Sequence, residues 1–222
     1  MWFTNLMTGL DTNAEGGISV MNTLTHCYFI DNGKMGVKLG TDSNMTQCFV
    51  GSNSLPTRDD DNWDGCGVFL AGWGSRLIGC HLFKNRIHIR SDWSSFNTIA
   101  DCQFEAGYRE DILLNGRAWN MLIINNMFGG KDPNAPNAPE LSQYNAITYE
   151  SISSDGAYRN KISDNHFAMN TDRPNAKYNH IIQEMEGCDY NMYSNNMFTQ
   201  NYVQDKPLVL VGEHSQAIGN MD

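Results

Sequence analysis

A short motif recurs down the whole chain and constrains the fold more than any other feature of the sequence. It reads apolar-x-x-(Asn or Cys)-x-apolar, as in Ile99-Ala100-Asp101-Cys102-Gln103-Phe104. Its fourth position falls at Asn5, Cys27, Cys48, Cys80, Cys102, Asn126, Asn165, Asn196 and Asn220, the first and last being weaker matches. Most intervals are 21–24 residues, and three are longer, at 32, 39 and 31. Self-similarity at such a period is typical of a solenoid.

A second apolar pattern precedes most copies of the motif. Apolar residues, many of them β-branched, alternate with other residues over short runs, and alternation with period two predicts strands. The runs are Val37–Leu39, Val68–Leu70, Ile87–Ile89, Ile112–Leu114, Ile147–Tyr149 and Leu208–Leu210. Each interval is therefore predicted to hold three short strands, with a tight bend at the Asn or Cys between the second and the third.

The sequence contains 26 Asn, and the repeat supplies a physical reason for them. In a solenoid, equivalent positions of successive coils stack about 4.8 Å apart. An inward Asn at a tight bend can bond the backbone and the Asn of the next coil, and it tolerates left-handed backbone angles. In the first four complete coils small buried thiols can pack there as hydrophobes. We expect one ladder of stacked Cys and Asn side chains.

The segments Asn97–Phe104 and Asn160–Phe167 show the repeat most fully, as NTIADCQF and NKISDNHF. On these motifs the chain resembles the right-handed parallel β-helix of the pectate-lyase-like superfamily, which includes phage tailspike depolymerases. The resemblance covers nearly the whole chain. It implies an all-β, right-handed, single-stranded parallel β-helix of about 8–9 coils with an Asn/Cys ladder. It does not specify activity, because lyases, hydrolases, transferases and inert stalks share the fold.

Residues 1–222 are expected to form a single β-helix domain. Both ends of the sequence fall inside a coil, and no capping helix is evident. Open solenoid ends expose unpaired strand edges and normally need caps. The domain is therefore expected to be a segment of a longer β-helix, or a protomer whose ends are covered by partners.

The composition excludes several classes of function. A net charge of -10 argues against a nucleic-acid or anionic-membrane surface and favours a neutral or metal-bridged partner. No run approaches 18 uninterrupted apolar residues, and the first residues lack the features of a secretion signal. The six Cys show no zinc-ligand spacing, and their redox state is left open. There is also no phosphate-binding loop and no nucleophile elbow.

The three long intervals place extra sequence around one strand of the coil. The insertions are about Ser52–Gly65, Gly129–Tyr144 together with Ser151–Tyr158, and Ala168–Lys177. All flank the first strand of their interval. The resemblance implies that the outer face of this strand carries a substrate groove walled by such loops, and loops on a rigid scaffold usually carry function. The alternative is that the insertions are neutral decoration.

Outward residues of this strand are the candidate catalytic groups. The alignment uses Ile89, Leu114, Tyr149 and Gln183, and it predicts one exposed column of Arg90, Asn115, Glu150 and Glu184. Glu150 and Glu184 would then lie on adjacent coils, about 5 Å apart at the backbone. Two carboxylates that close resist joint ionisation, which suits a glycoside hydrolase of the retaining type. Solvated surface acids are the alternative, and Ile181-Ile182 leaves the register ambiguous.

Further charged residues lie near the same strand. Asp111 and His88 are candidate catalytic groups beside the glutamates, while Arg90, Arg109, Asp92 and Asn115 are candidate substrate-binding groups. His88, Arg90 and Arg109 could hold a uronate or sialate carboxylate, or stabilise an enolate-like intermediate of a lyase. They could equally balance neighbouring acids in an acidic protein.

The insertion that begins at Ser52 contains a candidate calcium site and an aromatic platform. Asp60, Asn62 and Asp64 have the oxygen-rich spacing that begins a calcium loop, although Ala71 stands where an EF-hand needs its glutamate. Calcium is the only cofactor the sequence suggests. Trp63 lies among these residues and could stack on a sugar ring, as could Trp73, Trp93 and Trp119 in predicted turns.

These features predict a carbohydrate-active β-helix that binds and cleaves an extended polysaccharide, with Glu150 and Glu184 as acid and nucleophile or base. A polysaccharide lyase, a fructan-converting transferase and a non-catalytic stalk or adhesin are the alternatives. The resemblance to tailspikes further implies a homotrimer that is extracellular or part of a virion. The expected partner is a polysaccharide or oligosaccharide, with no nucleic acid and no membrane insertion.

Overall fold

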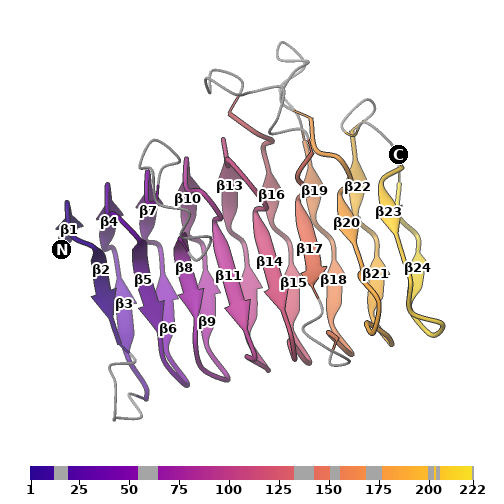
Figure 1. Ribbon diagram of the computed structural model, residues 1–222, viewed down its shortest axis with the longest axis horizontal. Helices are drawn as coiled ribbons and strands as arrows, with labels where there is room; N and C mark the ends of the chain where they lie inside the picture. The colour runs from indigo at the N-terminus through magenta and orange to yellow at the C-terminus, as the bar shows by residue number, and fades with distance from the viewer. Residues whose placement is uncertain are drawn as a thin grey trace.

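Three parallel β-sheets wind around one core in the computed structural model (Figure 1). The structure describes residues 1–12, 20–54, 65–132, 143–150, 156–168, 177–199, 203 and 206–221. Among these residues there are 24 strands and no helix, and each sheet contains eight strands. Successive strands belong to sheet 1, sheet 2 and sheet 3 in turn, so three strands complete one coil. The all-β, right-handed parallel β-helix expected from the sequence is confirmed, with eight coils.

Every strand pairs with its equivalent in the next coil. Sheet 1 consists of β1 (Trp2–Thr4), β4 (Tyr28–Ile30), β7 (Phe49–Gly51), β10 (His81–Phe83), β13 (Gln103–Glu105), β16 (Met127–Phe128), β19 (His166–Phe167) and β22 (Met197–Phe198). Sheet 2 consists of β2 (Thr8–Asp11), β5 (Met35–Leu39), β8 (Cys66–Leu70), β11 (Ile89–Asp92), β14 (Ile112–Asn115), β17 (Ile147–Glu150), β20 (Ile182–Gln183) and β23 (Leu208–Val209). Sheet 3 consists of β3 (Thr23–Thr25), β6 (Asn44–Thr46), β9 (Arg76–Ile78), β12 (Thr98–Ala100), β15 (Leu122–Ile124), β18 (Lys161–Ser163), β21 (Met192–Ser194) and β24 (Gln216–Ile218). We name the connections between them the 1–2, 2–3 and 3–1 corners.

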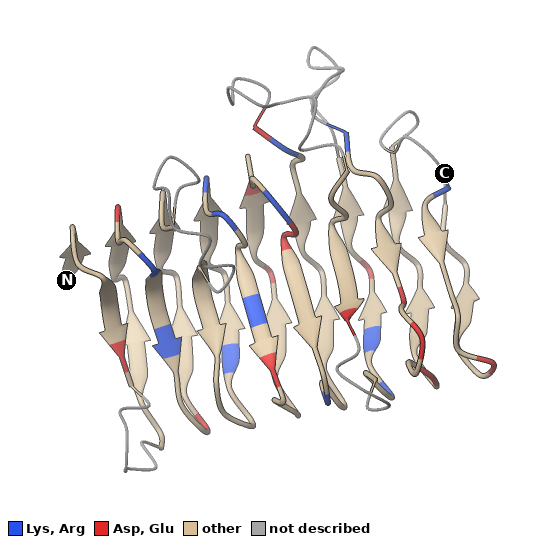
Figure 2. Ribbon diagram, in the orientation of Figure 1, with Lys and Arg blue, Asp and Glu red and all other residues tan. Residues whose placement is uncertain are grey.

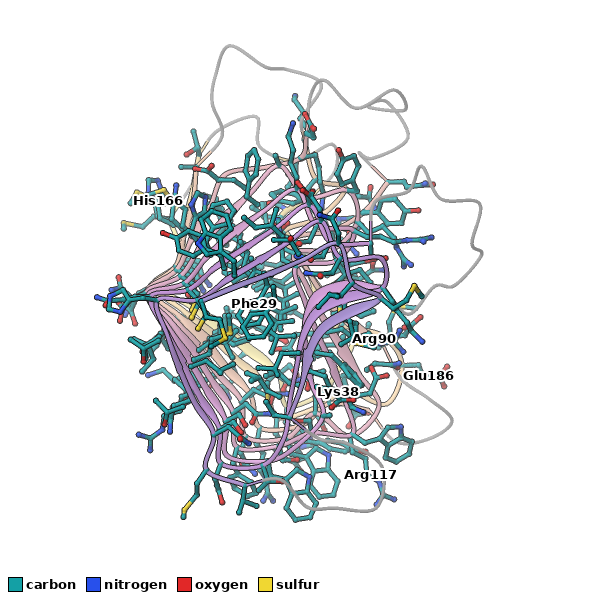
Figure 3. The ribbon with its side chains drawn as sticks, turned by 90° about the vertical axis from the view of Figure 1, so that its left-hand side faces the viewer. Phe29, Lys38, Arg90, Arg117, His166 and Glu186 are labelled. Carbon is teal, nitrogen blue, oxygen red and sulfur yellow. The ribbon has the colours of Figure 1, made fainter. Side chains whose placement is uncertain are left out.

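The core is a set of stacked columns of inward side chains. In sheet 1 the rings of Phe104, Phe128 and Phe167 stack in line, with centroids 4.7 and 4.4 Å apart. Figure 3 looks along the coil axis and shows Phe29, from the same inward column, in the centre of the cross-section. Burial of aliphatic and aromatic side chains from all three sheets supplies the main driving force for folding.

The 3–1 corner contains the ladder that the sequence predicts. The backbone N–H of Cys27 approaches the Cys48 Sγ at 3.4 Å, and that of Cys102 donates to Asn126 Oδ1 at 2.9 Å. From Asn126 onward each Asn donates both its backbone N–H and its side-chain amide to the Oδ1 of the next Asn, through Asn165, Asn196 and Asn220. The weak match at Asn5 was wrong. Thr4 pairs with Ile30, so Asn5 follows a strand of sheet 1 and lies outside the ladder.

Two further ladders occupy the other corners and were not predicted. At the 1–2 corner, Asn32 donates to Asn53, and Asn53 donates to Asn85, at 2.9–3.1 Å. At the 2–3 corner the stacked residues are Asn22, Ser43, Ser75, Asn97, Met121, Asn160, Asn191 and Ser215. All three turns of the coil are thus pinned to their neighbours by buried side chains.

All six cysteines carry free thiols, and all are buried. Cys48 and Cys80 stack in the 3–1 ladder, and their neighbours' thiols and burial raise both pKa values, that of Cys80 to about 12. These two thiols are therefore protonated at neutral pH and act as packing groups. No helix of the length and hydropathy needed to cross a membrane occurs among the described residues.

Replacement of Asn165 by Ala should destabilise the fold strongly. It removes the acceptor of two buried donors of Asn126, so we expect the free energy of unfolding to fall by about 3 kcal/mol. Denaturant titration followed by circular dichroism measures this change. Asn44→Ala, on the outer face of β6, is the matched control and should change stability by less than about 0.5 kcal/mol. Equal effects of the two substitutions would contradict a structural role of the ladder.

Candidate functional site

The outer face of sheet 2 presents one continuous column of side chains across all eight coils. Backbone pairing aligns Asp11, Lys38, Phe69, Arg90, Leu113, Thr148, Gln183 and Val209. Figure 3 shows Lys38 and Arg90 on the same side of the cross-section, and Figure 2 shows the charged positions along this sheet. Because neighbouring members lie about 4.8 Å apart, the column is suited to an extended ligand that follows the coil axis.

A shallow pocket opens on this face. It has a volume of about 150 Å³ and is lined by Lys34, Met35, Phe69, Arg90 and Asp92. The Arg90 guanidinium holds the Asp92 carboxylate with three hydrogen bonds of 2.7–3.0 Å. Lys38 pairs with Asp11 at 3.3 Å farther along. An aromatic and a thioether side chain beside cations and a carboxylate match the mixed apolar and polar surface of a sugar ring.

A second outward column lies two residues farther along the strands. Asp92 pairs with Asn115, and Asn115 pairs with Glu150, which confirms the predicted alignment of Asn115 with Glu150. Glu150 is exposed, whereas Asn115 is largely buried, and its Oδ1 has no hydrogen-bond partner among the residues described. Asp92 and Glu150 are separated by two coils, roughly 9–10 Å along the sheet.

The predicted pairing of Glu150 with Glu184 is wrong. Thr148 pairs with Gln183, so Glu184 is opposite Tyr149 and not Glu150. A shift of one residue turns a side chain to the other face of a sheet, and Glu184 consequently points into the core with 1% of its surface exposed. Arg90 was also misaligned, since it pairs with Leu113 and not with Asn115.

Glu184 is a structural anchor for the last coils. One carboxylate oxygen accepts hydrogen bonds of 2.7–2.9 Å from Tyr193 Oη, Asn191 Nδ2 and Ser215 Oγ. The other accepts from the backbone N–H groups of Val211 and Gly212 at 2.9 and 3.0 Å. Five donors satisfy the buried charge and tie the 2–3 corner to the segment after β23.

His88 lies inside the coil at the end of the Asn ladder of the 1–2 corner. Asn85 Oδ1 accepts from Asn53, so its amide nitrogen points to Val50 O and to His88 Nδ1, at 2.9 and 3.0 Å. The amide donates, and Nδ1 therefore accepts; the neutral ring carries its proton on Nε2. Nε2 faces Asp111 Oδ1 at 3.6 Å, and both residues are almost fully buried.

Lys131 and Tyr178 complete this buried network. Tyr178 donates to Asp111 Oδ2, and Lys131 donates to the carbonyl oxygens of Arg109 and Asn145. Burial raises the pKa of the Asp111 carboxyl to about 6 against the opposing charge of Lys131, and it lowers the pKa of the Lys131 ammonium. Neither the lysine nor the tyrosine was singled out from the sequence, because nothing local marks them as neighbours of Asp111.

The three predicted cations are not one cluster. His88 is inside the coil, Arg90 is on the outer face of sheet 2, and Arg109 lies at the 1–2 corner, where it pairs with Glu110 at 3.3 Å and covers the ring of Tyr144. Burial prevents His88 and Asp111 from touching a ligand on the outer face in this conformation. Lys34, Met35 and Phe69, which line the pocket, were missed. Phe69 could have been recognised from the sequence, because it is the outward residue of the predicted strand Val68–Leu70.

The long connections do flank sheet 2. β7 to β8, β16 to β17, β19 to β20 and β22 to β23 all cross the 1–2 corner, and β17 to β18 crosses the 2–3 corner. Trp63 and the candidate calcium ligands Asp60, Asn62 and Asp64 lie outside the described residues. Within the described ranges no three His, Cys, Asp or Glu side chains gather as a metal site would require.

Glu184→Gln should destabilise the protein, and Glu150→Gln should not. In the variant, the Gln side-chain NH2 group would face two or more of the five donors and could not accept their hydrogen bonds. We therefore expect the free energy of unfolding to fall by about 2–3 kcal/mol. The exposed Glu150 serves as the matched control, with an expected change below about 0.5 kcal/mol. Urea unfolding of both variants at pH 7 measures the difference. Indistinguishable midpoints for Glu184→Gln and wild type would contradict the anchoring role.

The stability of the protein should depend on pH through His88. Burial, followed by the charges of Lys131 and His81, lowers the pKa of its imidazole from 6.5 to about 3. Between these two pH values the imidazole of His88 is protonated in the unfolded chain but neutral in the folded chain. The stability that neutral His88 provides is therefore lost as the pH falls. Asp111 acts oppositely between pH 3.8 and about 6, because its raised pKa makes the folded chain bind the extra proton.

A His88→Gln variant separates the two effects, since it retains Asp111. The stability advantage of the wild type over this variant should shrink from pH 7 to pH 4, by roughly 3 kcal/mol at most. Urea unfolding midpoints at several pH values measure it. An advantage that stays constant over this range would show that the folded protein accommodates a charged His88.

Comparison with known proteins identifies the fold. No protein-family model matches the sequence, and no curated protein does. DFA-IIIase from Arthrobacter chlorophenolicus A6 in complex with GF2 matches with a TM-score of 0.64 and 16% identity, over 96% of this chain and 51% of that one. The alginate lyase from Paenibacillus sp. str. FPU-7 matches at 0.59 and 9%, over 90% and 63%. The A-module of mannuronan C-5 epimerase AlgE4 from Azotobacter vinelandii matches at 0.58 and 18%, over 94% and 54%.

This chain thus spans between half and two thirds of the length of these three proteins. At such identities the likeness concerns architecture, and it agrees with the three parallel sheets and their short corners. The chain is a right-handed parallel β-helix.

Proposed function

We propose that the chain is a carbohydrate-active β-helix that binds an extended polysaccharide along the outer face of sheet 2 and cleaves it. The observation that carries the proposal is the strip formed by Phe69, Arg90, Asp92, Asn115 and Glu150, which crosses four successive coils on one face. The structural neighbours named for an alginate lyase and a mannuronan epimerase support a saccharide ligand. Long connections on both sides of sheet 2 would wall the groove.

Asp92 and Glu150 replace Glu150 and Glu184 as the proposed catalytic pair. Their spacing of roughly 9–10 Å at the backbone suits an inverting glycoside hydrolase, in which a water molecule enters between the base and the sugar. Asp92, held by Arg90, would act as the base, and the exposed Glu150 as the acid. Asn115 lies between them and, because it is largely buried, would form the floor of the groove.

The remaining candidate residues from the sequence differ in whether they are buried or accessible to a ligand. His88, Asp111 and Glu184 support the groove from inside and would not touch substrate. Arg109 would contact ligand only at the 1–2 corner. Stacking on Trp63 and calcium binding by Asp60, Asn62 and Asp64 stay proposals for the connection between β7 and β8, as do homotrimer formation and an extracellular or virion location.

A polysaccharide lyase is the second candidate, and the cations of the pocket favour it. Lys34 and Arg90 line the pocket, and Lys38 lies in the same outward column, so a uronate carboxylate could be neutralised there. A lyase releases unsaturated uronates, which absorb in the ultraviolet, whereas a hydrolase does not. A non-catalytic stalk or adhesin would bind saccharide without turnover.

Substitution of the proposed pair tests the hydrolase. Asp92→Asn and Glu150→Gln should each lower kcat on a polysaccharide that the wild type cleaves by about a thousandfold, because each removes a proton-transfer group. Asp101→Asn, exposed at the 3–1 corner, is the matched control and should retain activity. Release of reducing ends from plant, algal and capsular polysaccharides gives the rate, and NMR of the first product gives the anomeric configuration.

Two results would overturn this assignment. Full turnover in both variants would exclude the pair, and ultraviolet-absorbing products would favour the lyase. Binding of a polysaccharide with no turnover of any tested substrate would favour the non-catalytic alternative.

A further inference from the structure

The 2–3 corner carries a row of aromatic side chains outside the groove of sheet 2. Parallel bridges align Ser95, Trp119, Tyr158 and Asp189 on successive coils. Phe96 and Tyr190 follow the first and last of these residues. Trp93 lies in the same turn as Phe96, and Trp73 lies in the preceding one. Trp73 and Phe96 are each 61% exposed, and Tyr190 is 53% exposed. Figure 3 shows Arg117 at this corner, away from Lys38 and Arg90. Exposed aromatic rings in a row are costly to hydrate and are typical of recognition surfaces.

A pocket of about 250 Å³ lies within this row. It is lined by Trp119, Asn120, Tyr158, Arg159 and Tyr190. The rings of Trp119 and Tyr158 are 6.0 Å apart and inclined at 56°. Tyr190 stacks flat on His214 at 4.4 Å, and a hydrogen bond of 2.7 Å between His214 Nδ1 and Asp189 Oδ2 fixes His214 in turn. The ring of Tyr190 is therefore supported on one face while much of its surface stays accessible.

The polar groups of the pocket have unused hydrogen-bonding capacity. Neither the Arg159 guanidinium nor the Asn120 amide makes a side-chain hydrogen bond or ion pair within the part of the chain that the structure describes. Trp119 Nε1 is buried, so this indole offers a ligand its ring surface and not its N–H group. The pocket thus offers a guanidinium and an amide as donors, and a guanidinium favours a ligand that carries a carboxylate.

The turn places several of these side chains at one position of the coil. Phe96, Asn120, Arg159 and Tyr190 occupy the same position in successive coils and have φ of 60°, 52°, 55° and 56°. Met21, Asp42 and Gly74 hold this left-handed position in earlier coils, so the conformation belongs to the turn itself.

We infer that the 2–3 corner is a second saccharide-binding site, which holds one acidic sugar ring between Trp119, Tyr158 and Tyr190. Arg159 pairs with the carboxylate of the sugar, Asn120 binds ring or hydroxyl oxygens, and the aromatic faces cover its C–H groups. Arg117, which lies over the rings of Trp93 and Trp119, adds positive charge in an otherwise acidic protein. The inference rests on the proposed function, because it takes a polysaccharide as the ligand.

The position of the pocket suggests what it does. It lies on the coils of β14, β17 and β20, at the corner that follows the strands ending in Asn115 and Glu150. A polysaccharide held at the corner would thus remain beside the proposed reacting column while its products leave. Such a second attachment raises the local concentration of substrate without any change in the groove.

Titration calorimetry with hexasaccharides of alginate, polygalacturonate and cellulose tests the site. The informative variants are Tyr190→Asn and Arg159→Asn, because Asn retains the left-handed backbone that Asn120 already adopts. Each should raise the Kd of the acidic hexasaccharides about tenfold. Binding of the acidic probes should also change the fluorescence of Trp119, and the uncharged cellohexaose should bind more weakly. Tyr28→Asn on the outer face of β4 and Arg76→Asn on β9 are matched controls and should leave the Kd unchanged.

Arg90→Ala, in the groove of sheet 2, separates this inference from the proposed function. Weaker binding in both Arg90→Ala and the two corner variants supports two sites. Weaker binding of the acidic hexasaccharides in the corner variants alone supports the corner site and overturns the proposed ligand groove on sheet 2. Weaker binding in Arg90→Ala alone, with corner variants that bind like the wild type, overturns the second site and still supports the groove of sheet 2 as a binding site. No binding of any probe by the wild type at millimolar concentration overturns both.

Discussion

The chain of amide hydrogen bonds at the corners is the constraint on which the rest of the structure depends. In the 3–1 corner each Asn gives two donors to the Oδ1 of the next Asn and a third bond to a backbone carbonyl, as Asn165 does to Asn196 and Ile123. These groups are buried, so a coil out of register would leave several donors unsatisfied, at about 1–3 kcal/mol each. Alternation alone does not distinguish register shifts of two residues. The ladders do, and they thereby align the outer columns of all three sheets.

The interruption of one ladder shapes the region behind the groove. At the 1–2 corner the Asn series stops at Asn85, and Gly107 takes the next position, where a Cβ would lie 2.7 Å from Asp111 Oδ1 and 3.0 Å from His88 Nε2. The side chains of His88 and Asp111 occupy the volume that another Asn would fill. The last Asn donates to His88 and so sets its tautomer. A polar network with mixed charges replaces uniform amides at the corner where the long connections to sheet 2 cross.

Much of the fold was predictable, because the repeat reports directly on stacking. The ladder positions from Cys27 to Asn220 were all placed correctly, since a tight bend of constant length lies between each of them and the following strand. The 2–3 ladder was not recognised because Asn, Ser and Met share its positions. Ser75 and Asn160 accept from a backbone N–H, whereas Met121 accepts from the side-chain amide of Asn97. Asn5 matched the motif by composition but follows a strand of sheet 1, where a bend residue in a left-handed conformation suits Asn equally well.

The candidate site was harder to predict, because it depends on register across corners of unequal length. Hydrophobic alternation allowed Ile89 to be aligned with Leu114 when its partner is Ile112, and the doublet Ile181-Ile182 allowed Gln183 to be placed on the wrong face. Counting back from the ladder does not resolve the second error. The inward residue of sheet 2 precedes its ladder residue by twelve positions at Leu114 and Asn126, but by nine at Leu39 and Cys48. The length of the 2–3 corner therefore varies from coil to coil, and the register of Glu184 follows only from the strand pairing in the structure.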